Sequence, residues 1–182
     1  MNKKISFLFF LGISFSLSAQ KEGNYYKEVG VKVVNSHYAT FKIDIPEKWF
    51  SYYTDPGMIA HSPNRFKEQV NPNKTSVSFI VHKKNYKRKN IDKSLKSFIR
   101  FQNQFYRKFK YKLFEAKHKL YGKYYIVKYS KNTKSSKEIV FVSILNWKKQ
   151  PYHLYYISNE STFDKYLLVA TRMINSFEII KK

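Results

Sequence analysis

The chain has 182 residues, 43% of them hydrophobic, with 35 Lys and Arg residues against 12 Asp and Glu residues and no cysteine. This length suits a single domain, and this hydrophobic content is sufficient for a packed core. The lack of cysteine excludes disulfides and cysteine-ligated zinc, and the net charge of +23 favours anionic partners.

The first residues have the pattern of a secretory signal peptide. Lys3 and Lys4 precede an apolar run over residues 5–17, and the small residue Ala19 is followed by Gln20. The run is shorter than the roughly 20 residues that span a bilayer. We therefore expect cleavage of residues 1–19 after Ala19 and a periplasmic or secreted mature protein. No later segment predicts an integral membrane protein.

The first half of the mature chain has the pattern of strands. After a polar lead-in over residues 20–30, residues 31–182 are interpreted as one globular domain. Strands are predicted over residues 31–34 and 38–46, and Phe41, Ile43 and Ile45 alternate with polar residues as in a half-buried strand. Trp49 and Phe50 are expected to pack on the core. A short strand over 58–61, a surface loop over 62–75 and a strand over 76–82 follow.

A helix is predicted from Asp92, as its N-terminal cap, to about residue 110. At about 100° per residue, its apolar side chains fall within about 120° of the helix surface, and basic side chains lie opposite. The predicted buried stripe consists of Leu95, Phe98, Ile99, Phe105, Tyr106 and Phe109. Phe101 and Tyr111 fall outside this stripe and are candidates for exposure.

More strands and a second helix complete the domain, which is therefore predicted to be α+β. Residues 111–120 and 123–131 predict a hairpin that turns at Gly122. Residues 138–147 are apolar at nearly every position, which predicts a central strand covered on both faces. A strand over 152–158 precedes a helix over 160–175. The inner stripe predicted for this last helix is Phe163, Tyr166, Leu167, Ala170, Met173 and Ile174.

Two short motifs stand at the two ends of this order of elements. The first hairpin ends in Ile43-Asp44-Ile45-Pro46-Glu47-Lys48-Trp49, and the closing helix runs into Asn175-Ser176-Phe177. Over residues 31–179 the chain thereby resembles the PsbP-like family, in which a strand ending in proline and tryptophan opens the domain and a helix with a Ser-Phe pair closes it. The resemblance implies an antiparallel β-sheet flanked by helices on both faces, an α/β/α sandwich.

The resemblance implies accessory binding and no particular reaction. Proteins similar to this pattern include extrinsic subunits of the photosynthetic oxygen-evolving complex, a nuclear-import factor that binds a small GTPase, and many bacterial envelope proteins. The matching positions here are core and turn residues, so no binding residues transfer. A cone-shaped fold of helices and a curved sheet is the competing architecture, but it begins with helices and this chain begins with strands.

The sequence contains no local motif for catalysis or metal binding. Its five histidines are scattered and are interpreted as ordinary strand or surface residues: His37, His61, His82, His118 and His153. Hydrolase turns, glycine-rich phosphate loops, zinc motifs and clustered calcium-binding Asp residues are missing. We therefore expect a non-enzymatic protein with no catalytic residue, metal or cofactor. The alternative is an envelope hydrolase whose site is assembled only in space.

Positive charge is concentrated over residues 82–131, which hold 17 Lys and Arg residues against Asp92 and Glu115. The helix and the segment before it carry a set of cations that we name the basic patch: Lys83, Lys84, Lys87, Arg88, Lys89, Lys93, Lys96, Arg100 and Arg107. Its expected partner is an anionic membrane surface, an acidic glycan or an acidic protein. Nucleic acid is not expected, because Phe98, Phe105 and Phe109 are predicted to be buried and cannot stack on bases.

The leading hypothesis is a secreted or periplasmic binding or accessory domain for an anionic envelope component or an acidic protein. A helix face that is merely solvated, without a partner, is the simplest competing interpretation of the basic patch. A structural role in a surface complex is a third.

Overall fold

The structure is a computed structural model, and it describes residues 31–36, 41–55, 58–63, 77–106, 108–133 and 136–180. In chain order its elements are β1 (Val31–Ser36), β2 (Phe41–Pro46), β3 (Phe50–Asp55), β4 (Met58–Ser62), β5 (Val77–Lys83), α3 (Ile91–Phe105), β6 (Lys112–His118), β7 (Gly122–Asn132), β8 (Lys137–Trp147), β9 (Gln150–Asn159), α4 (Phe163–Ser176) and β10 (Glu178–Ile179). The predicted signal peptide and lead-in lie outside the described residues. Within those residues, no helix is long and apolar enough to cross a membrane.

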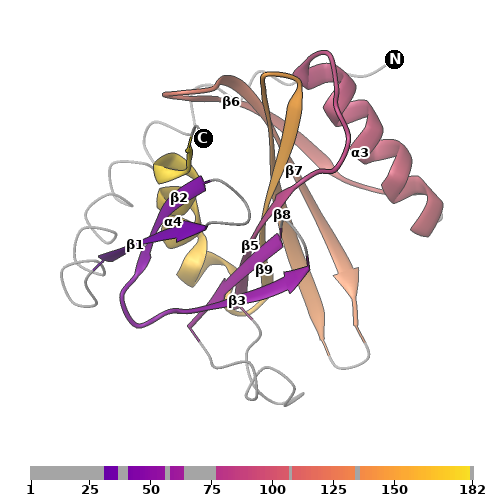
Figure 1. Cartoon of the computed structure of the whole chain (residues 1–182). Coiled ribbons are helices and arrows are strands. Elements are labelled where there is room, and N and C mark those ends of the chain that lie inside the picture. Colours follow the sequence, from indigo (N-terminus) through magenta and orange to yellow (C-terminus); the bar gives the residue numbers. More distant parts are fainter. Residues whose placement is uncertain are drawn as a thin grey trace.

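The larger sheet has seven strands in the order β3-β4-β5-β9-β8-β7-β6 (Figure 1). All of its neighbouring strands are antiparallel, as predicted. β5 pairs with β9, so α3 and the strands β6 to β8 are inserted between two strands that are neighbours in space. The register places His82 of β5 opposite His153 of β9. This pairing brings the residues that follow β5 beside the turn that joins β8 to β9.

Alternate residues of the central strands pack in different buried clusters. On β9, Leu154 and Tyr156 belong to a cluster that includes α4, whereas Tyr155 packs against a cluster that includes Phe98 of α3. The apolar run of β8 is divided in the same way, with Val142 in the α3 cluster. Because successive side chains of a strand point to opposite faces, both faces of these strands are covered, as the apolar run predicted.

A smaller sheet of β1, β2 and β10 brings the two ends of the domain together. β2 pairs with both of the other strands, and its alternation of buried and partly exposed residues is as predicted. Asp44 N donates a hydrogen bond to Ser176 Oγ at 3.0 Å, and the rings of Phe41 and Phe177 lie 5.4 Å apart. The two sequence motifs at the ends of the domain therefore meet in space.

The N-terminal cap of α3 is Asn90, so the prediction of Asp92 was wrong. Lys93 N donates to Asn90 Oδ1 at 3.0 Å, and the extended backbone of Asn90 is typical of a cap. Asp92 lies in the first turn, where its carboxylate accepts a hydrogen bond from the Tyr125 hydroxyl of β7 at 2.5 Å. Asn and Asp side chains can both cap a helix. Here the carboxylate of Asp92 is bonded to Tyr125 of β7, and Asn90 is the cap.

Helix α3 ends at Phe105, well before the predicted residue 110, because the chain turns to pack two aromatic rings on β7. The rings of Tyr106 and Phe109 lie 6.1 and 5.0 Å from that of Tyr129. Phe105 is left 67% exposed beside Phe101, which is 54% exposed, with ring centroids 4.8 Å apart. The prediction that Phe105 belongs to the buried stripe was therefore wrong, whereas the exposure of Phe101 was anticipated.

Other differences concern short elements. Trp49 is buried as predicted, but Phe50 is 36% exposed and begins strand β3, which the sequence did not predict. The two-residue strand β10 was also missed. Helix α4 buries most of its predicted stripe, and Val169 joins it. Nearly all of the predicted loop over residues 62–75 lies outside the described residues.

Candidate anion-binding surface

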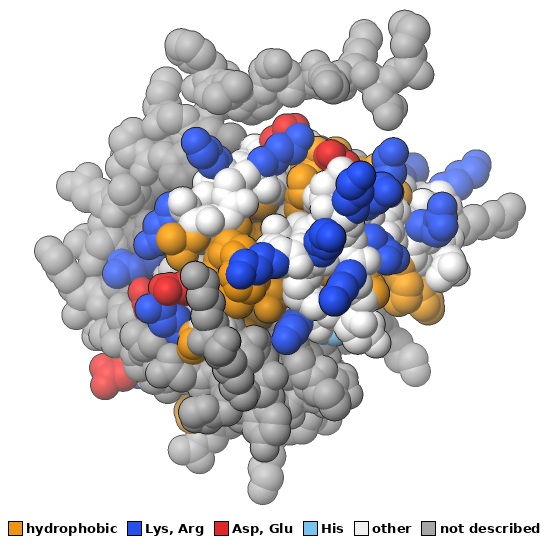
Figure 2. Space-filling view, turned by 45° about the horizontal axis from the view of Figure 1, so that its top comes forward, with side chains coloured by type: hydrophobic (Ala, Val, Ile, Leu, Met, Phe, Trp, Pro, Cys, Tyr) orange, Lys and Arg blue, Asp and Glu red, His pale blue; other side chains and the backbone are white. Residues whose placement is uncertain are grey.

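The structure divides the basic patch into exposed and partly buried cations. The exposed cations lie on α3 and in the segment before it: Lys87, Lys89, Lys93, Lys96 and Arg100. The partly buried cations are Lys83, Lys84 and Arg88. Arg107 lies outside the described residues. Figure 2 shows Lys and Arg side chains spread over this face of the molecule, with few carboxylates between them.

The segment between β5 and α3 is held on the β8–β9 hairpin by hydrogen bonds of its backbone atoms. Lys84 N donates to Pro151 O at 3.0 Å, and Arg88 N donates to Lys149 O at 2.7 Å. Asn146 Nδ2 donates to Arg88 O at 3.0 Å. The backbone positions of Lys84 and Arg88 are therefore fixed by the neighbouring hairpin.

The β8–β9 turn adds two exposed lysines that the sequence did not assign to the patch. Lys148 and Lys149 have φ angles of 47° and 68°, the left-handed region that favours glycine or asparagine. The hydrogen bond from Arg88 N to Lys149 O places this turn directly beside the patch. The sequence did not predict that this turn lies beside the patch, because the two are brought together only by the pairing of β5 with β9.

The acidic residues of the basic segment are engaged away from the exposed cations. Lys123 Nζ lies 3.1 Å from a Glu115 carboxylate oxygen and 4.0 Å from one of Asp92. Asp92 also accepts the hydrogen bond of the Tyr125 hydroxyl. Among the described residues, no ion pair joins a carboxylate to any of the five exposed cations of the patch. The positive potential of this face is therefore not neutralised locally.

A groove of about 470 Å³ lies between α3 and the residues that follow β5. The side chains that line it are cationic, aromatic or polar, and none of them is Asp or Glu. They include His82, Lys84, Tyr86, Arg88, Phe98, Arg100, Phe101, His153 and Tyr155. The groove thus brings four patch cations, Lys83 included, together with aromatic rings from α3 and two β9 residues that the sequence did not assign to a site.

Burial in the groove lowers the pKa values of Lys84 and His153 and raises the pKa of Tyr155. Lys84 Nζ donates to His82 Nδ1 at 2.9 Å and lies 5.9 Å from the centre of the Tyr155 ring. Burial lowers the pKa of Lys84 from 10.5 to about 8, since the ammonium loses water without gaining a carboxylate. Burial, reinforced by the nearby Lys84 and His82, lowers the pKa of His153 well below 6.5.

His153 has one ring nitrogen without a partner. Its Nδ1 lies 3.3 Å from the Tyr155 hydroxyl, and its ring meets Phe98 edge to face at 5.4 Å. Its Nε2 has no hydrogen-bond partner among the described residues, although the side chain is buried. Buried polar atoms are normally paired, so an unpaired nitrogen that belongs to a groove-lining residue requires an explanation.

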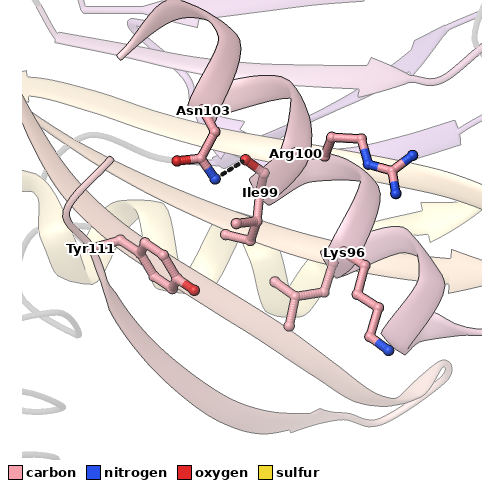
Figure 3. A pocket seen from close by; sticks show the side chains of 6 residues that line it. Lys96, Ile99, Arg100, Asn103 and Tyr111 are labelled. Atoms are coloured by element: carbon pink, nitrogen blue, oxygen red, sulfur yellow. Dashed lines mark hydrogen bonds between the residues drawn. The ribbon is translucent and has the colours of Figure 1, made fainter. Parts of the chain in front are cut away.

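A second hollow of about 430 Å³ lies on another side of α3, against the residues that precede β6. Figure 3 shows Ile99 and Tyr111 facing one another across it, and Arg100 pointing away from Tyr111. Asn103 is occupied by a hydrogen bond to Ile99 O at 3.0 Å. This hollow therefore combines apolar side chains with two cations of the basic patch, Lys96 and Arg100. Tyr111, a candidate for exposure, is 40% exposed.

The described residues contain no group of three or more His, Cys, Asp or Glu side chains that could hold a metal ion. One contact has the geometry of a nucleophile and base: Ser51 Oγ lies 3.0 Å from Nδ1 of the buried His61, directly opposite on β4. Neither of the two hollows is lined by this pair. The hydrolase alternative therefore gains a contact between two side chains that lies apart from both of these hollows.

No family model and no curated protein matches the sequence. Among solved structures, the cyanobacterial PsbP (CyanoP) of Synechocystis sp. PCC 6803 is similar, with a TM-score of 0.56 and 11% identity over 83% of this chain and 93% of that chain. The chain has the PsbP-like fold. The resemblance predicted from the two end motifs is thus confirmed at the level of the fold, an α+β structure with an antiparallel sheet.

Two further solved structures are similar. A protein of Bacteroides thetaiotaomicron has a TM-score of 0.55 and 11% identity over 83% of this chain. This chain spans about half of that protein, 49% of its length. LpqN of Mycobacterium tuberculosis has a TM-score of 0.47 and 9% identity, with 87% of this chain and 96% of that chain covered. At these identities the likeness to the PsbP-like fold concerns the backbone architecture and no individual site residue.

Proposed function

We propose that this protein is a secreted or periplasmic binding domain, without enzymatic activity, that docks through the basic patch on an anionic envelope component or an acidic protein. The proposal depends on the five exposed cations of the patch, which no described carboxylate neutralises. The signal-peptide pattern of residues 1–19 supports the location. The PsbP-like fold, shared with cyanobacterial PsbP, is compatible with an accessory role.

The expected affinity is modest and depends on salt. Each Lys or Arg near an anionic surface contributes about 1 kcal/mol, so five of them supply about 5 kcal/mol, which corresponds to a dissociation constant of about 0.2 mM. Exposed charges are screened within about 8 Å at physiological ionic strength. Stable attachment then requires either many contacts along a polyanion or an additional site on the protein.

The proposal includes the organisation of the chain. Residues 1–19 are removed, residues 20–30 form a lead-in, and residues 31–182 form one domain in which the antiparallel sheet is sandwiched between helices. The two buried clusters support the sandwich, because α3 and α4 pack with alternate residues of β8 and β9.

Charge reversal on α3 tests the basic patch. The patch variant carries Lys93→Glu, Lys96→Glu and Arg100→Glu, and a control variant carries the same charge change at the exposed residues Lys48, Lys119 and Lys165. We expect the patch variant to lose retention on heparin and on vesicles rich in phosphatidylglycerol at low salt, while the control variant is retained. Equal loss by both variants shows that net charge, and no particular surface, is responsible and refutes the patch.

The location is tested separately, by fractionating cells and sequencing the N-terminus of the recovered protein. We expect the protein outside the cytoplasm with Gln20 as its first residue. A cytoplasmic protein that retains Met1 contradicts this part of the proposal.

A further inference from the structure

The groove between α3 and the segment after β5 differs in chemistry from the exposed part of the basic patch. Its inner cations, Lys83, Lys84 and Arg88, are partly buried and lie among aromatic rings, whereas Arg100 at its edge and the other cations of the patch are exposed to water. We propose that this groove binds a small aromatic anion, with its phosphate or carboxylate group against Lys84 and Arg88 and its ring against Phe101. This inference rests on the proposed anion-binding function, because the groove and the exposed part of the basic patch belong to the same positively charged surface.

The charged end of the groove can accept an anion, because it holds cations without a carboxylate. Lys84 Nζ is within hydrogen-bond distance of His82 Nδ1 and, among the described residues, of no carboxylate. Arg88 Nε donates to Ser97 Oγ at 2.7 Å and Nη1 donates to Lys87 O at 2.9 Å, so its guanidinium is oriented while other N–H groups stay available. The Tyr86 ring lies 4.3 Å from Arg88 Cζ and restrains it further.

The partial burial of Lys84 favours a bound anion over bulk water. Moving an ammonium group out of water costs free energy, and an adjacent negative charge offsets this cost. The lowered pKa of Lys84 is the sign of this uncompensated cost. An anion in the groove stabilises the charged form of the lysine, and the same anion on an exposed lysine gains much less.

The buried nitrogen of His153 is a second, independent observation. Its Nε2 has no partner among the described residues, and the residue lines the groove beside Tyr155 and Phe98. This nitrogen is closed to solvent in the structure, so a polar atom of a ligand pairs with it only if the floor of the groove opens. The exposed lysines outside the groove, in contrast, are hydrated and require no ligand.

The other end of the groove is suited to a ring. Phe98 is 2% exposed and forms part of the wall, whereas Phe101 is 54% exposed at the rim. The volume of about 470 Å³ is within the range of small-molecule sites. A flat apolar body packed against the Phe101 ring gains from burial and from offset stacking. An extended polyanion lacks such a body, which is why the groove favours a small aromatic anion.

The experiment uses phenyl phosphate and benzoate as probes, with inorganic phosphate and phenol as controls that lack the ring or the charge. Binding to the mature protein is followed by calorimetry and by 13C NMR of labelled lysine side chains. We expect at least one aromatic anion to bind more tightly than both controls and to raise the pKa of Lys84. Binding by benzoate alone or phenyl phosphate alone supports the proposal and identifies the charged group.

Three variants complete the test. Lys84→Met is expected to weaken the aromatic anion about tenfold, the usual loss for a charge-assisted hydrogen bond. Phe101→Ser, at an exposed position where folding is not at risk, is expected to weaken the aromatic anion but not inorganic phosphate. Lys96→Met, on the outer side of α3, is the matched control and should leave probe binding unchanged.

Two results overturn the proposal. One is the absence of saturable binding of both aromatic anions at millimolar concentration. The other is equal weakening by Lys84→Met and Lys96→Met, which indicates unspecific charge attraction. Heparin retention is measured on the same samples. Loss of probe binding with retention on heparin refutes the groove and leaves the docking function intact. Probe binding without retention on heparin supports the groove and refutes the docking function.

Discussion

Folded-state stability should decrease in mild acid because of His153, and the variant His153→Leu should reduce that dependence. The ring lies on β9 opposite His82, is 1% exposed and packs edge to face on Phe98. Protonation would place a buried charge near Lys84 and His82, with only the Tyr155 hydroxyl at Nδ1. The folded protein therefore keeps this ring neutral, while the unfolded chain takes up a proton near the ordinary pKa of about 6.5.

The direction and size follow from proton linkage. Because the pKa of His153 is lowered by folding, its contribution is fully present above pH 6.5 and is lost as the pH falls below that value. Near pH 5.5 the unfolded ring is about 90% protonated, so the free energy of unfolding decreases by about 1.2 kcal/mol per pH unit. Down to about pH 5 the cumulative loss reaches about 2 kcal/mol when the folded ring stays neutral.

Urea unfolding at several values between about pH 5 and pH 8 measures this effect for the natural protein and for His153→Leu. The free energy of unfolding of the natural protein minus that of His153→Leu should be constant above pH 7 and decrease below pH 6.5, because only the natural protein loses the contribution of His153. Two parallel curves refute the reasoning. So does an NMR titration in which the folded His153 ring protonates at or above pH 6.5.

Three further predictions concern stability and are each checked by urea unfolding. Asn90→Ala should cost about 1 kcal/mol by removing the cap of α3, and an unchanged midpoint contradicts the assignment of the cap. Gly122→Ala should cost about 1 kcal/mol, since φ is 70° and a Cβ there meets nothing within 4 Å, so only backbone strain contributes. Lys148→Asn combined with Lys149→Gly should stabilise the protein by about 1 to 2 kcal/mol, because these residues suit two successive positive φ angles; destabilisation shows that the lysine side chains matter more than the turn.

Patterns that depend only on neighbouring residues were predicted well. β2 buries Phe41, Ile43 and Ile45, and α4 buries Phe163, Ala170 and other members of its stripe. A strand repeats every two residues and a helix every 3.6, whatever the element packs against. The covered strand β8 followed for the same reason, because a run of apolar residues has no polar face to expose.

Predictions failed where a distant contact decided between two local options. Asn90 and Asp92 can both cap a helix, and the Tyr125 hydroxyl on β7 engages Asp92. Helical periodicity continued to residue 110, but packing on Tyr129 ended α3 at Phe105. The two-residue strand β10 exists only through its pairing with β2, which no local pattern announces.

The amino-acid sequence by itself determined the excess of positive charge, its concentration over residues 82–131, and the alternation that forms the sheet. Only the tertiary structure decided which cations face water and which lie in a groove. The pairing of β5 with β9 places His153 and Tyr155 beside Lys84, and the β8–β9 turn holds Arg88 in position. Burial and hydrogen bonding of a side chain depend on residues distant in sequence, and these change the chemistry of a lysine or histidine that composition only counts.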